Sequence, residues 1–153
     1  NGRVTPLRYR FLTAMQGSLG IGVNLGHWNE ADSKLAAEMI AYYKRVRQSV
    51  QEGRLYRLLS PSEADAAVNE YVARDGRQAV VFACRHSQQY LRAVPTIRLR
   101  GLVPEAVYRV ERLDDRLVDK HQTLSGAALM ERGLTFDLKG DFDATAVLLE
   151  RVD

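Results

Sequence analysis

Residues 67–85 read AVNEYVARDGRQAVVFACR, and this stretch decides the fold class of the 153-residue chain. Its first part, Ala67 to Ala73, alternates apolar and polar side chains, which is typical of a half-buried strand. Its last part, Gln78 to Arg85, is apolar enough for a central strand. Asp75–Gly76 lies between them and favours a type I′ turn, because both of its residues tolerate positive φ. The stretch therefore predicts an antiparallel hairpin.

Further short strands, separated by turn residues, are expected on both sides of this hairpin. They are predicted at Leu55 to Leu59, Thr96 to Arg100, Val107 to Leu113, around Gln122–Leu124, at Leu134 to Leu138 and at Ala144 to Val152. About seven short strands at such close spacing are typical of an antiparallel sandwich. The sequence thus predicts a mainly β fold, a Greek-key-like β-sandwich over residues 54–153.

One long helix is expected before the sandwich, from about Glu30 to Gln51. Asn29 is a suitable N-cap, and Gly53 suits the position that ends the helix. Apolar residues recur at spacings of three and four and form one stripe: Leu35, Met39, Tyr42, Tyr43, Val46 and Val50. The short apolar run Phe11 to Met15 is predicted as a strand, and the glycines of Gly17 to Gly22 as a tightly packed turn into the helix.

The overall composition is that of a globular protein without a nucleic-acid or membrane surface. The net charge of +3 comes from basic residues that are interspersed with acids, whereas nucleic-acid binders gather basic residues on one face. No apolar run is long enough to cross a bilayer, and no signal peptide is recognisable, although the chain starts at Asn1. The lone cysteine, Cys84, fits a reducing compartment.

The residue types that carry chemistry do not form a convincing catalytic pattern. Cys84 and His86 share a strand face, but a core cysteine beside a strand-end histidine explains them. The spacing of Gly17 to Gly22 fits no phosphate-binding loop. Carboxylate pairs are conceivable among residues in predicted loops, where aspartate commonly forms local hydrogen bonds: Asp114, Asp115 and Asp119, or Asp141 and Asp143. Several aromatic residues could stack on sugars or lie in the core: Trp28, Tyr56, Tyr71, Tyr90 and Tyr108.

Two stretches carry a family likeness that spans nearly the whole chain, from about Arg8 to Glu150. RFLTAMQGSLGIGVNLGHW (residues 10–28) and AEMIAYYKRVRQSVQEGRLYRLLSP (residues 37–61) resemble the end of the catalytic barrel in glycoside hydrolase family 36, the bacterial-type α-galactosidases. Weaker matches follow in the family's order at Arg98 to Leu102, Pro104, Tyr108, Ser125–Gly126, Leu129–Met130 and Gly133–Leu134.

The resemblance implies a (β/α)8 catalytic barrel followed by a β-sandwich. Residues 1–53 would be the last strand and helix of the barrel, and residues 54–153 the C-terminal sandwich. Such a retaining enzyme uses two aspartates from earlier barrel strands and needs no metal or organic cofactor. No residue here matches either aspartate, so the chain alone is expected to be structural and inactive. Gln16, Gly17 and Ser18 follow the expected last strand and are candidates for a wall of the sugar pocket.

The resemblance also implies a cytoplasmic parent enzyme that removes terminal α-linked galactose from oligosaccharides such as raffinose or melibiose. The parent is expected to form homo-oligomers and to have no nucleic-acid or membrane partner. Two alternatives stay open. A carbohydrate-binding module would place exposed aromatic side chains in a row. An interaction domain would use the Phe11–Met15 strand, which would either pack on its own helix or drive self-association.

Overall fold

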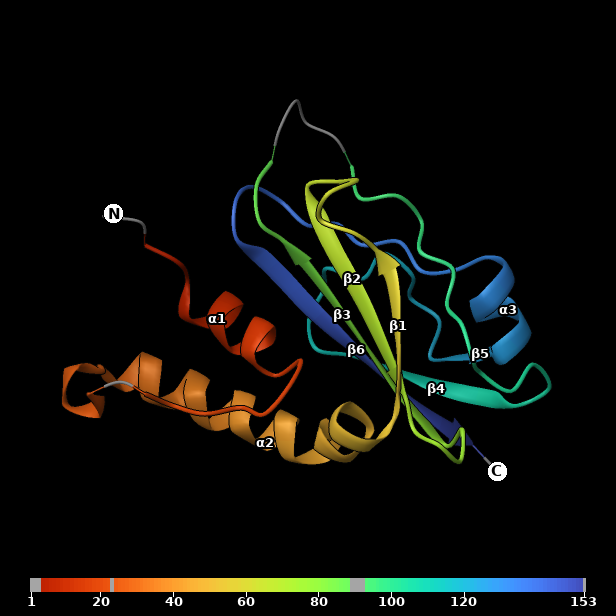
Figure 1. Ribbon diagram of the computed structural model, residues 1–153, viewed down its shortest axis with the longest axis horizontal. Coiled ribbons are helices and arrows are strands. Elements are labelled where there is room, and N and C mark those ends of the chain that lie inside the picture. The colour runs from red at the N-terminus through yellow and green to blue at the C-terminus, as the bar shows by residue number, and fades with distance from the viewer. Residues whose placement is uncertain (1–3, 23, 89–92, 153) are drawn as a thin grey trace.

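The computed structural model describes residues 4–22, 24–88 and 93–152 of the chain. Its strands form a single six-stranded antiparallel sheet in the order β1-β2-β3-β6-β4-β5 (Figure 1). The elements along the chain are α1 (Leu7–Ala14), a 3-10 turn (Leu25–His27), α2 (Glu30–Glu52), β1 (Arg54–Leu59), β2 (Ala66–Val72), β3 (Gln78–Arg85), β4 (Val107–Arg112), β5 (Thr123–Ser125), α3 (Gly126–Glu131) and β6 (Asp143–Val152).

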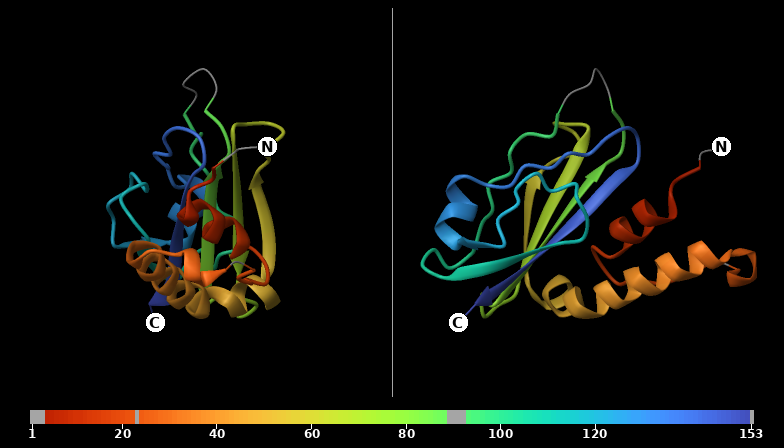
Figure 2. Two further views of the ribbon diagram at one scale, coloured as in Figure 1. Left: turned by 90° about the vertical axis from the view of Figure 1, so that its left-hand side faces the viewer. Right: turned by 180° about the vertical axis from the view of Figure 1, so that it is seen from behind.

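The sheet is covered on both faces, so the molecule has three layers. α1 and α2 pack on one face, over β2, β3 and β6 (Figure 2). The other face is covered by α3 and by the irregular segments around residues 94–138, which form a second hydrophobic core with the sheet. This antiparallel β architecture confirms the predicted fold class. None of the described helices is long and apolar enough to span a membrane.

The hairpin of β2 and β3 forms as expected, with a wider turn than the sequence suggests. Val72 pairs with Ala79, and the amide of Ala73 donates to the carbonyl of Gln78 at 2.8 Å. Gly76 has a φ of 69°, but Asp75 does not share the positive φ that a type I′ turn requires. The four residues from Arg74 to Arg77 therefore make the connection.

The long helix α2 has the predicted start and stop. The side chain of Asn29 accepts a hydrogen bond from the amide of Asp32 at 2.8 Å, which caps the first turn. Gly53 ends the helix for a steric reason. A Cβ at this position would lie 2.2 Å from the carbonyl oxygen of Ser49 and 2.6 Å from that of Val72.

The segment Phe11–Met15 is not a strand, and this expectation is wrong. Residues 7–14 form helix α1, which packs on α2 and on the sheet. Phe11, Leu12 and Met15 recur at helical spacing and are at most 5% exposed. A short apolar run does not distinguish a strand from a buried helix, so the sequence alone misassigns it. Of the two options for an interaction domain, the segment takes the first, packing on its own helix.

Two other predicted strands are reduced to single bridges. Ile97 pairs with Leu134, and Leu117 with Phe136, but neither pair extends into a ladder. The layer opposite the helices therefore consists of extended segments rather than a second sheet. The short helix α3 lies where the sequence predicts no helix, and Ser125 caps it by accepting from the amide of Ala128 at 3.1 Å.

Candidate functional site

Gln16 is held in place by the face of the sheet that α1 covers. Its side-chain oxygen accepts from Nδ2 of Asn69 at 2.7 Å, and its backbone carbonyl accepts from the hydroxyl of Tyr71 at 2.7 Å. Its Nε2 donates to the carbonyl of Leu12 at 3.3 Å and approaches Sγ of Cys84 at 3.4 Å. The end of α1 is thus fixed on β2 and β3 through one side chain.

The next residues are fixed from the other side by Tyr43 on α2. Its hydroxyl donates to the carbonyl of Gly17 at 2.7 Å and accepts from the amide of Leu19 at 3.3 Å. Gln51 donates to the same hydroxyl at 2.9 Å, which orients it. Ser18 lies between these anchors and is exposed. The three predicted site residues therefore form one turn, exposed at Gly17 and Ser18. Tyr71 and Tyr43 hold its backbone, and Asn69 holds the side chain of Gln16.

The glycines after this turn have open space around them. A Cβ added at Gly17, Gly20 or Gly22 would meet no described atom within 4 Å. None of the three has a positive φ. The expectation that tight packing explains these glycines is therefore wrong, and the described part of the chain supplies neither a steric nor a conformational need for them.

A small apolar hollow lies beside the glycine-rich segment. It has a volume of about 140 Å³ and is lined by α1, by residues 19–22 and by Trp28. Ile21 at its edge is 43% exposed, although it is a large apolar residue. Trp28 packs edge-on against Phe11, with ring centroids 6.4 Å apart. This surface joins exposed apolar side chains to a backbone that lies outside any helix or strand of the structure.

The Cys84–His86 pair has no catalytic geometry. Cys84 is buried beneath Gln16, and burial raises the pKa of its thiol to about 12. His86 is exposed at the end of β3. A thiol that stays protonated in the core is neither a nucleophile nor a metal ligand at neutral pH. Among the described residues, no group of three or more His, Cys, Asp or Glu side chains is placed to hold a metal ion.

Two of the candidate carboxylates, Asp114 and Asp143, are tied into ion pairs that join different elements. Asp114 accepts from Arg8 on α1, from Arg116 at 2.9 Å and from the hydroxyl of Thr145 at 2.8 Å. Nε of Arg116 also donates to Asp143 at 2.6 Å. Asp115 is fully solvated beside Lys120. These contacts hold α1, β6 and the segment after β4 together, which accounts for Asp114 and Asp143 as structural residues.

No aromatic side chain described by the structure is exposed enough to form a sugar-stacking platform. Tyr71 and Tyr108 are buried, while Trp28 and Tyr56 are half-buried. Tyr90 lies outside the described residues. A carbohydrate-binding module needs a row of exposed rings, so this arrangement disfavours that alternative.

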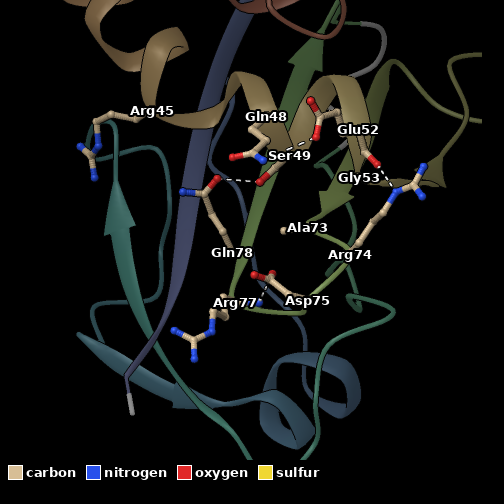
Figure 3. A pocket seen from close by; sticks show the side chains of 10 residues that line it. All are labelled: Arg45, Gln48, Ser49, Glu52, Gly53, Ala73, Arg74, Asp75, Arg77 and Gln78. Atoms are coloured by element: carbon tan, nitrogen blue, oxygen red, sulfur yellow. Dashed lines mark hydrogen bonds between the residues drawn. The ribbon is translucent and has the colours of Figure 1, made fainter.

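A larger polar hollow, of about 410 Å³, lies where α2 ends above the β2–β3 turn (Figure 3). Its polar groups mostly bind one another. Ser49 donates to Gln78 at 2.6 Å, and Arg74 donates to the carbonyl of Glu52 at 2.8 Å. Arg45 forms a bidentate ion pair with Glu111, with N–O distances of 2.6 and 2.7 Å. This hollow is a joint between the helix and the hairpin rather than a site with free groups.

Comparison with known proteins identifies the family to which this arrangement belongs. The model described as the glycosyl hydrolase family 36 C-terminal domain matches residues 66–149, more than half of the chain. The chain belongs to glycosyl hydrolase family 36. The family 36 likeness extends over both helices. Alpha-galactosidase C of Emericella nidulans is 36% identical over 150 residues, which are 98% of this chain and 19% of that protein.

Solved family 36 structures show the same fold. Variants of the α-galactosidase AgaA from Geobacillus stearothermophilus match 99% of this chain in complexes with raffinose (TM-score 0.86, 29% identity) and with stachyose (TM-score 0.87, 30% identity). The chain covers 20% of each of those structures. It therefore spans about one fifth of the length of these relatives.

The sequence points to the three residues of the turn but not to the residues that hold it. Asn69 lies in a strand that reads only as alternating, and Tyr43 and Tyr71 read as ordinary core aromatics. Hydrogen bonds from Tyr43 and Asn69 join positions 26 and 53 residues apart. No local pattern in a single sequence predicts such contacts.

Proposed function

We propose that this chain is the C-terminal portion of an α-galactosidase that removes terminal α-linked galactose from oligosaccharides. The observation that carries the proposal is the match of almost the whole chain, helices included, to about one fifth of several α-galactosidases. Raffinose and stachyose, which occupy two of the related structures, represent the proposed substrate class. In this proposal residues 1–53 complete a (β/α)8 barrel, and residues 54–153 form the sheet domain behind it.

The open glycine segment supports a barrel partner on the helical side. Residues 18–22 lie outside any helix or strand of the structure, and Leu19 and Ile21 alternate with glycines. A strand of a parallel barrel is buried on both faces by neighbouring elements. Those elements would come from parts of the barrel outside these 153 residues. We infer that residues 18–22, rather than Phe11–Met15, are the barrel's last strand, with α1 as the helix before it and α2 as the helix after it.

Gln16 and Gly17 directly precede this strand, and Ser18 begins it. Because barrel pockets lie at the C-terminal ends of the strands, a strand at residues 18–22 removes Gln16 to Ser18 from the proposed pocket wall and leaves them to anchor the barrel end to the sheet domain. The clamp formed by Tyr43, Asn69 and Tyr71 would hold the turn still. The sheet domain would then stabilise the turn and supply no reacting group itself.

We further propose that the two catalytic carboxylates come from barrel strands outside these 153 residues. The candidate acids here engage in structural ion pairs or lie in solvent. The parent would be cytoplasmic and self-associating, and the single buried, unpaired Cys84 accords with a reducing compartment.

The test is an activity assay on matched chains. The 153-residue chain alone is expected to release no nitrophenol from an aryl α-galactoside, whereas the full-length protein that contains it releases nitrophenol and cleaves raffinose. Turnover by the purified short chain would refute the absence of catalytic acids. A full-length protein inactive on α-galactosides but active on another glycoside would refute the proposed substrate class.

A further inference from the structure

A third hollow lies on the side of the sheet away from α1 and α2, in the layer of irregular segments. It has a volume of about 600 Å³. Three arginines, Arg98, Arg100 and Arg132, line it, and no acidic side chain is among its lining residues. Leu58 and Leu59, at the end of the edge strand β1, form its apolar side. The hollow shares no lining residue with the turn at Gln16 to Ser18.

The extended backbone explains why the arginines face the hollow. Ile97 and Leu99 are 4% and 2% exposed and face the core, while the alternate residues Arg98 and Arg100 are exposed. Successive side chains of an extended chain point to opposite sides, so Arg98 and Arg100 share the outer side. Arg132 ends α3, two residues before the Leu134 that pairs with Ile97.

The backbone that carries these arginines is held at several points. Ile97 and Leu134 exchange two hydrogen bonds of 2.8 Å, and the amide of Leu99 donates to the carbonyl of Leu129 at 3.2 Å. The amide of Arg100 donates to the buried carboxyl of Glu70 at 2.7 Å. A Cβ at Gly133 would lie 2.4 Å from the carbonyl oxygen of Ile97, so the two segments approach closely. These contacts therefore hold the backbone that carries the three arginines in a fixed position.

The charge of the hollow has little counterpart in the described part of the chain, where the one carboxyl that interacts electrostatically with it is the buried Glu70 beside Arg100. None of the three guanidinium groups forms an ion pair with a described carboxylate. Arg45 and Arg116, in contrast, each pair with an acid brought to them by another element. Like charges that share one hollow repel each other, and an anion between them relieves this repulsion.

We propose that this hollow binds a small multivalent oxyanion, either a phosphate group or a polycarboxylate. The planar fork of a guanidinium group matches two oxygens of such an anion, and several forks around one hollow favour more than a single negative charge. Thr96, whose hydroxyl lies 3.2 Å from that of Thr135, adds a neutral donor at the rim. This site is independent of the proposed glycosidase function, because it lies on the other side of the sheet.

Calorimetric titration of the 153-residue chain at constant ionic strength tests the proposal. Inorganic phosphate and citrate are the two probes, and saturable binding of one of them distinguishes a phosphate ligand from a polycarboxylate. The double variant R98A/R132A is expected to weaken that binding at least about tenfold, because two charged hydrogen-bond donors are lost. R98K/R132K keeps the charge without the forks and is also expected to bind more weakly.

The matched control is R47A/R109A, which removes the same charge from exposed positions outside the hollow. It is expected to bind the probe as the unmodified chain does. Absence of saturation with both probes, equal weakening in the two alanine pairs, or full affinity in the lysine pair would overturn the proposal. All substituted side chains are exposed, and a thermal melt of each variant verifies that it folds.

Discussion

Glu70 places a carboxyl group in the core on the sheet face opposite the helices. Its side chain is fully buried, and one oxygen accepts from the amide of Arg100, while the other has no described partner. Burial raises the pKa of this carboxyl from 4.5 to about 8. A buried carboxyl that stays protonated at neutral pH avoids the larger cost of a buried charge.

This raised pKa predicts a pH-dependent stability. Between about pH 4.5 and 8 the folded chain keeps a proton on Glu70 that the unfolded chain releases, so the free energy of unfolding falls as pH rises through this range. The contribution is complete below pH 4.5 and is lost once pH exceeds about 8. Glu70→Gln removes this dependence, and at pH 8 the variant is expected to be more stable by roughly 2 to 4 kcal/mol.

Urea unfolding of both chains from pH 5 to 9 measures the effect. Every other ionisable group is the same in both chains, so the difference between the two curves isolates Glu70. Parallel curves would mean that Glu70 is ionised in the folded state.

Tyr71 illustrates how one hydroxyl holds the candidate turn. Tyr71→Phe keeps the buried ring but removes the donor to the Gln16 carbonyl, so the free energy of unfolding is expected to fall by about 1 kcal/mol. Faster amide hydrogen exchange in residues 17–22 is also expected, because their anchor is weakened. Tyr56→Phe is the control, since no hydrogen bond of the Tyr56 hydroxyl is described. Unchanged exchange in Tyr71→Phe would show that Tyr43 and Asn69 suffice.

At the scale of elements, the hydrophobic period predicts α2, β1, β2, β3, β4 and β6 closely. Their patterns are long, and turn residues mark their limits: Gly53 follows α2, Pro61 follows β1 and Gly140 precedes β6. α1 fails because its apolar run is too short to show a period of 3.6. The segments at residues 96–100 and 134–138 alternate like strands, but they form only isolated bridges, Ile97 with Leu134 and Phe136 with Leu117, and no continuous ladder. An alternation of apolar and polar residues indicates that an extended segment is buried on one side. It does not indicate that another strand pairs with that segment.

The helical state of residues 7–14 has a direct test. Leu12 of α1 is fully buried against α2 and the sheet, so Leu12→Ala is expected to lower the free energy of unfolding by about 2 to 5 kcal/mol. The neighbouring Thr13 is exposed, and Thr13→Ala is expected to change stability by less than about 0.5 kcal/mol. Chemical denaturation followed by circular dichroism compares the two. Similar midpoints for both variants would contradict a packed α1.

At the scale of the whole molecule, the helices and the sheet share one core. Val80, Phe82 and Leu148 are fully buried under α1 and α2. The ion pairs Arg8–Asp114 and Arg45–Glu111 join the two helices to the segment around β4. The matched family model begins at residue 66, yet α1 and α2, which cover the face of β2, β3 and β6, both come before it.

A truncation therefore tests whether residues 54–153 are stable alone. Removal of residues 1–53 exposes the apolar face of β3 and β6, so the shorter chain is expected to bind the dye ANS strongly and to unfold without a cooperative transition. A chain that starts at Pro6 is the control, because Val4 is exposed and its loss uncovers nothing. A truncated sheet with the full chain's urea midpoint would mean that the two parts fold independently.

The open surroundings of Gly20 and Gly22 have a consequence for anyone who improves this polypeptide by directed evolution. In these 153 residues, alanine at either position meets no neighbour and restricts the denatured chain, which favours the native state by about 0.4 to 1 kcal/mol. A screen for thermostable short chains would therefore select both replacements. In an intact enzyme with a neighbouring barrel strand against this segment, the same methyl groups would clash with that strand. Variants selected for the stability of the short chain would therefore lose activity in the intact enzyme.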